Sequence, residues 1–152
     1  MFNSVSMTRL AAGIAYASGV QAPSEADRII PQVKALVDTR LDGKAGRILI
    51  YNPDAISMWL VQKYTEDFAP VMARTDLTVP VASVMPAVTP VCFGTMYTGA
   101  APEIHGIRKY EKPVIGTDSL FDALSRGKRR VALVAVADSS MALIFAGRDI
   151  DY

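Results

Sequence analysis

The chain has 152 residues, of which 51% are hydrophobic, and its formal net charge is +1. This length and composition can bury one core, so we expect a single domain over residues 1–152. The near-neutral charge argues against a nucleic-acid-binding surface, so no nucleic-acid polymer is expected as a partner. Cys92 is the only cysteine. It excludes a disulfide framework and a cysteine-based zinc site, and it fits a reducing, cytoplasmic compartment.

Residues 1–45 are expected to form helices that lead into the rest of the domain. Residues 10–20 are small and apolar, but this segment contains two glycines and is too short to span a bilayer. We therefore expect a buried helix there, and no membrane association. Ser24 and Asp27 resemble the start of a capping box, and apolar residues at helical spacing follow as far as Leu41.

Three apolar runs predict β-strands. Residues 47–51 and 129–136 contain unbroken apolar stretches, which are typical of strands covered on both faces. Residues 77–84 form the third run, and Pro80 places it at a sheet edge or at a break.

Helical patterns separate these runs. They cover residues 56–71, with an aromatic stripe expected in the core, then residues 89–98 and 117–125. Residues 141–145 fit either a short helix or a strand. Strands that alternate with helices predict an α/β fold with a mainly parallel sheet flanked by helices.

Thr89 stands directly before Pro90 and a segment of small residues that ends at Gly99. This pattern predicts a helix with Thr89 as its N-cap and Pro90 as its first residue. A helix N-terminus attracts phosphate through its free N–H groups and its dipole. Most Thr-Pro pairs only begin helices, so the pair alone leaves open both a helix cap and a nucleophile.

Asp54 follows the predicted strand 47–51 as Thr89 follows the strand 77–84, and 89 − 54 = 35 residues separate them. Ligands of α/β sheets bind beyond the carboxyl ends of the strands. A carboxylate and a hydroxyl there could share a divalent metal ion, which would make the hydroxyl a nucleophile. The alternative is that Asp54 only caps the helix predicted over residues 56–71.

Three motifs resemble the alkaline phosphatase superfamily, and within it the nucleotide pyrophosphatase/phosphodiesterase branch. They are Ile-Tyr-Asn-Pro-Asp at residues 50–54, Val-Met-Pro-Ala-Val-Thr-Pro at 84–90, and Tyr-Thr-Gly-Ala-Ala-Pro-Glu-Ile-His-Gly-Ile at 97–107. That family carries similar motifs in the same order at similar spacing. The resemblance is strongest over residues 46–122 and implies an alkaline-phosphatase-like α/β core.

The resemblance implies roles for single residues. Asp54 would be a metal ligand, and Thr89 would be both a metal ligand and the nucleophile that takes up a phosphoryl or nucleotidyl group. The backbone N–H of Val91 or Cys92 would hold a phosphate oxygen, and Tyr110 stands where the family carries a phosphate-binding Asn. The implied function is metal-dependent hydrolysis of a small phosphoester at a two-metal site, with zinc as the expected metal.

The C-terminal part departs from that family. The family takes further Asp and His ligands from the C-terminal half of its domain, whereas the only histidine here, His105, falls in a turn motif. We therefore expect a domain that is truncated at its C-terminus and a metal site that is incomplete.

Two functions stay open. One is a phosphoester hydrolase completed by a missing C-terminal half, and the other is a non-catalytic phosphate- or nucleotide-binding remnant. In either case an exposed apolar sheet predicts pairing with the missing half or a homo-oligomer.

Overall fold

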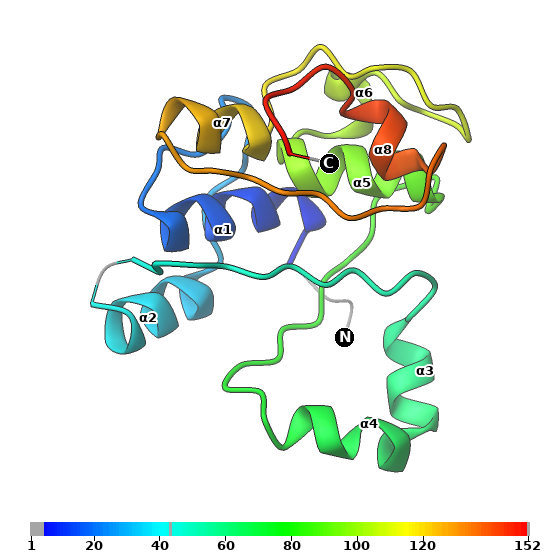
Figure 1. Cartoon of the computed structure of the whole chain (residues 1–152). Coiled ribbons are helices and arrows are strands. Elements are labelled where there is room, and N and C mark those ends of the chain that lie inside the picture. Colours follow the sequence, from blue (N-terminus) through cyan, green and yellow to red (C-terminus); the bar gives the residue numbers. More distant parts are fainter. Residues whose placement is uncertain (1–4, 43, 152) are drawn as a thin grey trace.

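The computed structural model describes residues 5–42 and 44–151, and the architecture over these residues is helical (Figure 1). In chain order the elements are a 3₁₀ helix, η1 (Met7–Arg9), and the α-helices α1 (Leu10–Ser18), α2 (Pro31–Arg40), α3 (Met58–Lys63), α4 (Thr65–Met72), α5 (Thr89–Thr98), α6 (Pro102–His105), α7 (Leu120–Arg126) and α8 (Ser140–Ile144). The helices η1, α1, α2, α5, α6, α7 and α8 form one body, in which α2 packs against α1.

The predicted α/β fold with a mainly parallel sheet is wrong. Among the described residues, β-pairing is limited to two isolated parallel bridges, Ser6 with Ala82 and Ala132 with Asp151. The three predicted strands are extended segments that do not pair with one another. The apolar pattern favours an extended backbone locally, but a sheet also needs neighbouring strands in register.

The helices that flank the predicted strands agree better with the sequence. A helix was expected over residues 10–20, and α1 lies there with Ala11 and Ala15 fully buried. The capping box at Ser24 is wrong, because α2 begins only at Pro31, with Ile30 as its N-cap. A proline at the first helical position is favourable, since its missing N–H would have no partner there.

The predicted helix over residues 117–125 is confirmed as α7. The Ser119 side chain accepts from the N–H of Asp122, whose carboxylate accepts from the N–H of Ser119, which completes a capping box. The short segment at residues 141–145, left open as helix or strand, is the helix α8.

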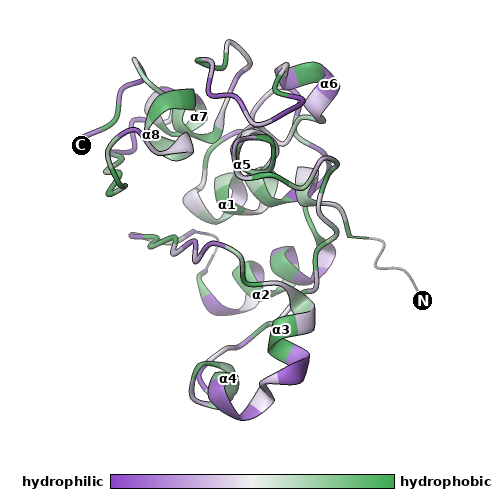
Figure 2. Cartoon of the chain, turned by 90° about the vertical axis from the view of Figure 1, so that its right-hand side faces the viewer, coloured by the Kyte–Doolittle hydropathy of each residue, from purple (hydrophilic) through white to green (hydrophobic). Residues whose placement is uncertain are grey.

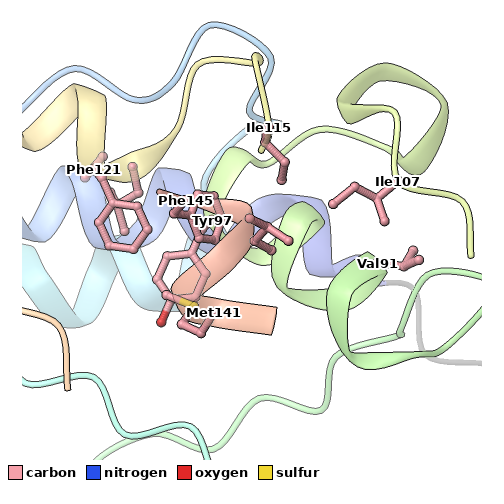
Figure 3. Packing of buried hydrophobic residues seen from close by; sticks show 10 residues of the cluster. Val91, Tyr97, Ile107, Ile115, Phe121, Met141 and Phe145 are labelled. Carbon is pink, nitrogen blue, oxygen red and sulfur yellow. The ribbon is translucent and has the colours of Figure 1, made fainter. Parts of the chain in front are cut away.

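Helix α5 lies at the centre of the body and contacts η1, α1, α6, α7 and α8. The ring of Tyr97, in α5, stacks on the ring of Phe121, in α7, with ring centroids 5.0 Å apart. Both rings meet Phe145 edge-on (Figure 3). Phe145 is fully buried. The core is therefore an aromatic cluster between helices.

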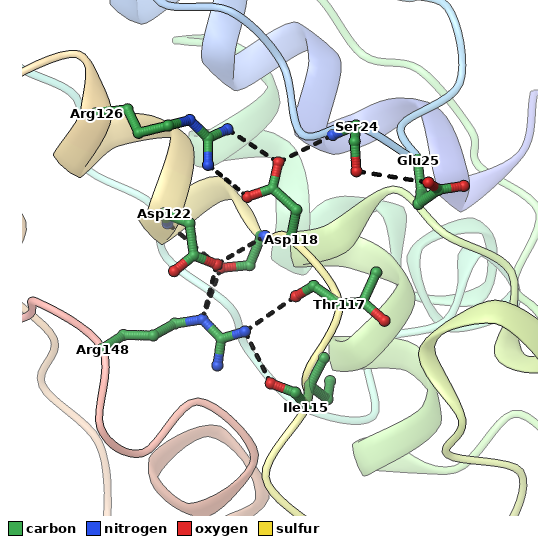
Figure 4. A network of polar contacts seen from close by, with 9 residues as sticks. Ser24, Glu25, Ile115, Thr117, Asp118, Asp122, Arg126 and Arg148 are labelled. Atoms are coloured by element: carbon green, nitrogen blue, oxygen red, sulfur yellow. Dashed lines mark hydrogen bonds and ion pairs between the residues drawn. The ribbon is translucent and has the colours of Figure 1, made fainter.

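Polar contacts tie the loop before α7 to its surroundings (Figure 4). The guanidinium of Arg148 donates to the carboxylate of Asp122 and to the carbonyl oxygens of Ile115 and Thr117, at 2.9–3.0 Å. Burial alone would raise the pKa of Asp122, but the hydrogen bonds from Ser119 and Arg148 outweigh it and lower the pKa. This ion pair of Arg148 and Asp122 therefore lies at the edge of the buried core and not on the exposed surface.

Helices α3 and α4 stand away from the body (Figures 1 and 2). The prediction of one helix over residues 56–71 with a buried aromatic stripe is wrong on both points. The helix breaks at Tyr64, where the hydroxyl of Thr65 donates to the carbonyl oxygens of Val61 and Gln62. No residue of α3 or α4 is buried, and Trp59 is 58% exposed.

Because Phe145 is buried and Trp59 is exposed, substituting them should lower the free energy of unfolding by different amounts. Phe145→Ala should lower the free energy of unfolding by about 3–5 kcal/mol, because it leaves a cavity among packed rings. Trp59→Ala, the matched control, should change it by less than about 0.5 kcal/mol because Trp59 is exposed. Urea unfolding followed by circular dichroism measures both. Equal losses would contradict the described packing.

Candidate functional site

A cavity of about 1120 Å³ lies between the extended segments 45–52 and 128–136. Side chains of α1, α5, α7 and α8 form its floor. Asp54 and Thr89 both line this cavity. The two residues that the sequence singled out therefore line the same cavity, although the sheet expected to position them is absent from the described residues.

Thr89 is the first residue of α5, and Val88 is the N-cap. The predicted assignment of Thr89 as N-cap is thus displaced by one residue. Its side chain is partly exposed, and its hydroxyl has no hydrogen-bond partner among the described residues. The predicted end of the helix at Gly99 is confirmed: Gly99 has a φ of 73° and its N–H donates to Thr95.

Asp54 lies in an exposed turn just after the segment 45–52. Its carboxylate accepts from the N–H of Ala55 at 2.9 Å, and Ala55 has a φ of 58°. The alternative in which Asp54 caps the following helix is wrong, because Ser57 is the N-cap of α3 and accepts from Leu60 at 3.3 Å. The carboxylate therefore has oxygen lone pairs that face solvent at the cavity.

The three groups proposed to hold phosphate are placed differently. Val91 is fully buried in the core. The N–H of Cys92 already donates to the carbonyl oxygen of Val88 at 3.0 Å, so it is not free for a phosphate. Tyr110 is 66% exposed and does not line the cavity.

Asn52 and Tyr97 form a contact at the cavity that the sequence did not single out. The Asn52 amide donates to the hydroxyl oxygen of Tyr97 at 2.6 Å. Burial raises the pKa of Tyr97, and this hydrogen bond opposes the rise. The only sequence signal is position, since Asn52 lies two residues before Asp54. The contact fastens the segment that carries Asp54 to the helix that begins at Thr89.

Cationic side chains gather at the opposite end of the cavity. Arg47, Lys128 and Arg130 all line it. Arg130 meets Asp151 at 3.6 Å, but both side chains are exposed, so the pair contributes little. Arg47 is far from Lys128 and Arg130 in the sequence, so their grouping comes from the fold.

The described residues contain no group of three or more His, Cys, Asp and Glu side chains that could hold a metal ion. Asp54 and Thr89 offer two oxygen donors, whereas zinc takes four ligands. The two-zinc site that the resemblance implies therefore does not fit the described part of the chain.

Comparison with known proteins gives no match to a family model, to a curated protein or to a solved structure. Within the described residues, no helix is both long enough and apolar enough to cross a membrane.

His105 is buried between α5 and α6 and has partners at both ring nitrogens. Its Nδ1 accepts from the N–H of Ile107 at 3.3 Å, so Nε2 carries the proton and donates to the hydroxyl of Thr95 at 3.0 Å. The ring also lies against Gly94, where a Cβ would come within 2.8 Å of it. His105 therefore holds the turn after α5 and has no free nitrogen for a ligand.

Burial lowers the pKa of His105 below its ordinary value of 6.5, which links folding to pH. Below pH 6.5 the unfolded chain takes up a proton that the folded chain does not, so stability falls as the pH falls. We expect a lower free energy of unfolding at pH 5.5 than at pH 7.5. In His105→Gln this difference should vanish, because carboxylates titrate at lower pH. Urea titrations at both pH values test this; an unchanged pH dependence in the variant would refute it.

Proposed function

We propose that this chain supplies the nucleophile of a phosphoester hydrolase that resembles phosphodiesterases and nucleotide pyrophosphatases. The observation that carries the proposal is the shared cavity of Asp54 and Thr89, which lie 35 positions apart in the sequence (89 − 54). The free hydroxyl of Thr89 and the exposed carboxylate of Asp54 support it, as does the resemblance of the three motifs.

In this proposal Thr89 Oγ1 attacks phosphorus, and a bond from phosphorus to the leaving oxygen breaks in line with the attack. The leaving alcohol or phosphate takes up a proton, and water later releases the phosphoryl or nucleotidyl group from Thr89. Asp54 is the carboxylate at the cavity end that could accept the hydroxyl proton. Arg47, Lys128 and Arg130 would attract the anionic substrate.

The remaining metal ligands of such an enzyme would come from another polypeptide or a C-terminal continuation. The proposal therefore keeps a divalent metal, with zinc as the first candidate, as a requirement of the completed enzyme. It also keeps a cytoplasmic location, for which the single cysteine is the supporting observation.

The test is hydrolysis of bis(p-nitrophenyl) phosphate, with and without added zinc, by the chain and by two variants. Thr89→Ala should lower turnover at least about 100-fold, because the attacking oxygen is lost. Thr75→Ala removes an exposed threonine outside the cavity and should leave turnover unchanged. Acid-quenched samples should show the nitrophenyl phosphate adduct on Thr89 by peptide mass spectrometry. Undiminished turnover in Thr89→Ala would refute the nucleophile assignment.

A second candidate function is phosphate or nucleotide binding without turnover. The four cationic side chains that line the cavity favour it, because they supply charge for an anion without any nucleophile. Calorimetric titration with inorganic pyrophosphate separates the two functions. Binding that Arg47→Ala weakens, with no hydrolysis and no adduct at any metal concentration, would support this candidate and contradict the hydrolase.

A further inference from the structure

The two extended segments that wall the cavity, residues 46–52 and 130–136, leave most of their backbone groups unpaired. Among the described residues, no backbone hydrogen bond involves residues 46–52. On the other wall, the carbonyl oxygen of Val131 and the N–H of Leu133 pair with Asp151 at 2.9 and 2.8 Å, and the carbonyl oxygen of Val136 accepts from the N–H of Ser139 at 3.1 Å. Unpaired extended backbone is a template for a further extended segment.

Backbone direction shows which groups of the second wall are free. In an extended segment, the N–H and C=O of one residue point to the same side, and the side alternates along the chain. Because Val131 and Leu133 point to Asp151, Ala132 and Val134 point the other way. Figure 1 shows residues 149–151 on one side of this wall and residues 46–52 on the other. Ala132 and Val134 therefore present their backbone groups to the cavity.

Fixed contacts hold the N-terminal ends of both walls at the same place. The N–H of Ala45 donates to the carbonyl oxygen of Ala17 at 2.7 Å. The guanidinium of Arg129 donates to the carbonyl oxygen of Ser18, the residue after Ala17, at 2.7 and 3.0 Å. Both walls thus start from the C-terminal end of α1.

The C-terminal ends of the walls are fastened separately. Asn52 is held by Tyr97 at 2.6 Å, and the carbonyl oxygen of Asp138 accepts from the ammonium of Lys112 at 2.6 Å. The walls are therefore held apart as a preformed groove, which lowers the entropic cost of binding.

The size and lining of the groove suit a polypeptide segment. Its volume of about 1120 Å³ exceeds the range of about 300–1,000 Å³ that is common for small-molecule pockets. Partly exposed apolar side chains line the floor, namely Ile14 of α1, Phe93 of α5 and Leu124 of α7, above the buried core. An extended segment could bury alternate apolar side chains on this floor while its backbone pairs with the walls.

Charge gives the occupant a direction. Arg47, Lys128 and Arg130 stand at the N-terminal ends of the walls, and Asp54 stands at the other end. Arg129 and the carboxylate of Asp151 line the cavity beside the cations, and Asp151 offsets part of their charge through its pair with Arg130. A carboxylate is favoured beside the three cations and disfavoured beside Asp54. Both walls run in the same direction in Figure 1, and the existing bridge between Ala132 and Asp151 is parallel.

We propose that this groove binds an extended apolar segment of a partner polypeptide, parallel to both walls, with a carboxylate side chain at its N-terminal end against Arg47, Lys128 and Arg130. The binding needs neither Thr89 nor a metal, so it stands independently of the proposed hydrolysis.

The probe is the N-acetylated peptide Asp-Val-Thr-Val-Thr-Val-Thr with fluorescein at its C-terminus, followed by fluorescence anisotropy. Two neighbouring substitutions form a matched pair. Val134→Pro removes an N–H that faces the groove, whereas Ala135→Pro removes one that faces away. Val134→Pro should weaken binding about tenfold, and Ala135→Pro less than about twofold. Circular dichroism checks that both variants keep the helical fold.

Exchanging the charges of Arg47 and of the first peptide residue tests the direction in which the peptide lies in the groove. Arg47→Glu should weaken binding of the acidic peptide, and a peptide with Lys in place of the N-terminal Asp should regain affinity for that variant. The proposal would be overturned if the unaltered chain showed no saturable binding of the acidic peptide. Equal effects of the two proline substitutions on peptide affinity would also overturn it. So would light scattering that shows a dimer whose groove the peptide cannot enter, because a second copy would then be the occupant.

Discussion

The body depends on the close packing of helix α5 among the 3₁₀ helix η1 and four other α-helices. Gly94 lets the ring of His105 approach, with a Cβ position only 2.8 Å from the ring, and Gly99 ends the helix next to Ala26. Tyr97 lies about one turn after Gly94. Its ring stacks on Phe121 of α7 and meets Phe145, at the end of α8, edge-on. Because these contacts fill the interior, α5 has a fixed place, and so has Thr89 at its first position.

Tyr97 also links the core to the cavity. Its ring belongs to the buried aromatic cluster, and its hydroxyl oxygen accepts from Asn52, which lies two residues before Asp54. A buried phenol with a polar partner is stable in such a position, because the ring is apolar and the oxygen is satisfied. The segment that carries Asp54 is therefore fastened to one core side chain near the C-terminal end of α5.

The surface carries much apolar area that the described helices leave uncovered. Leu49 is 92% exposed and Val134 is 99% exposed, on the two walls of the groove. Helices α3 and α4 add Trp59 and Val71, and neither helix packs against the body. Exposed apolar surface of this extent is typical of interaction sites. These segments would expose little apolar surface if another polypeptide covered them, which agrees with the proposal that the groove binds a partner segment.

Local signals in the sequence determined several helices. Ser119 with Asp122, Gly99 after α5 and the small residues of α1 act within a few positions, so their effects can be seen in the sequence. The sequence also indicated extended backbone at residues 47–51 and 129–136. Whether those segments pair was decided by tertiary structure, because pairing needs a neighbouring strand in register. Among the described residues, no backbone hydrogen bond joins the two segments. The grouping of Arg47 with Lys128 and Arg130 has the same origin, since only folding brings distant residues to one cavity.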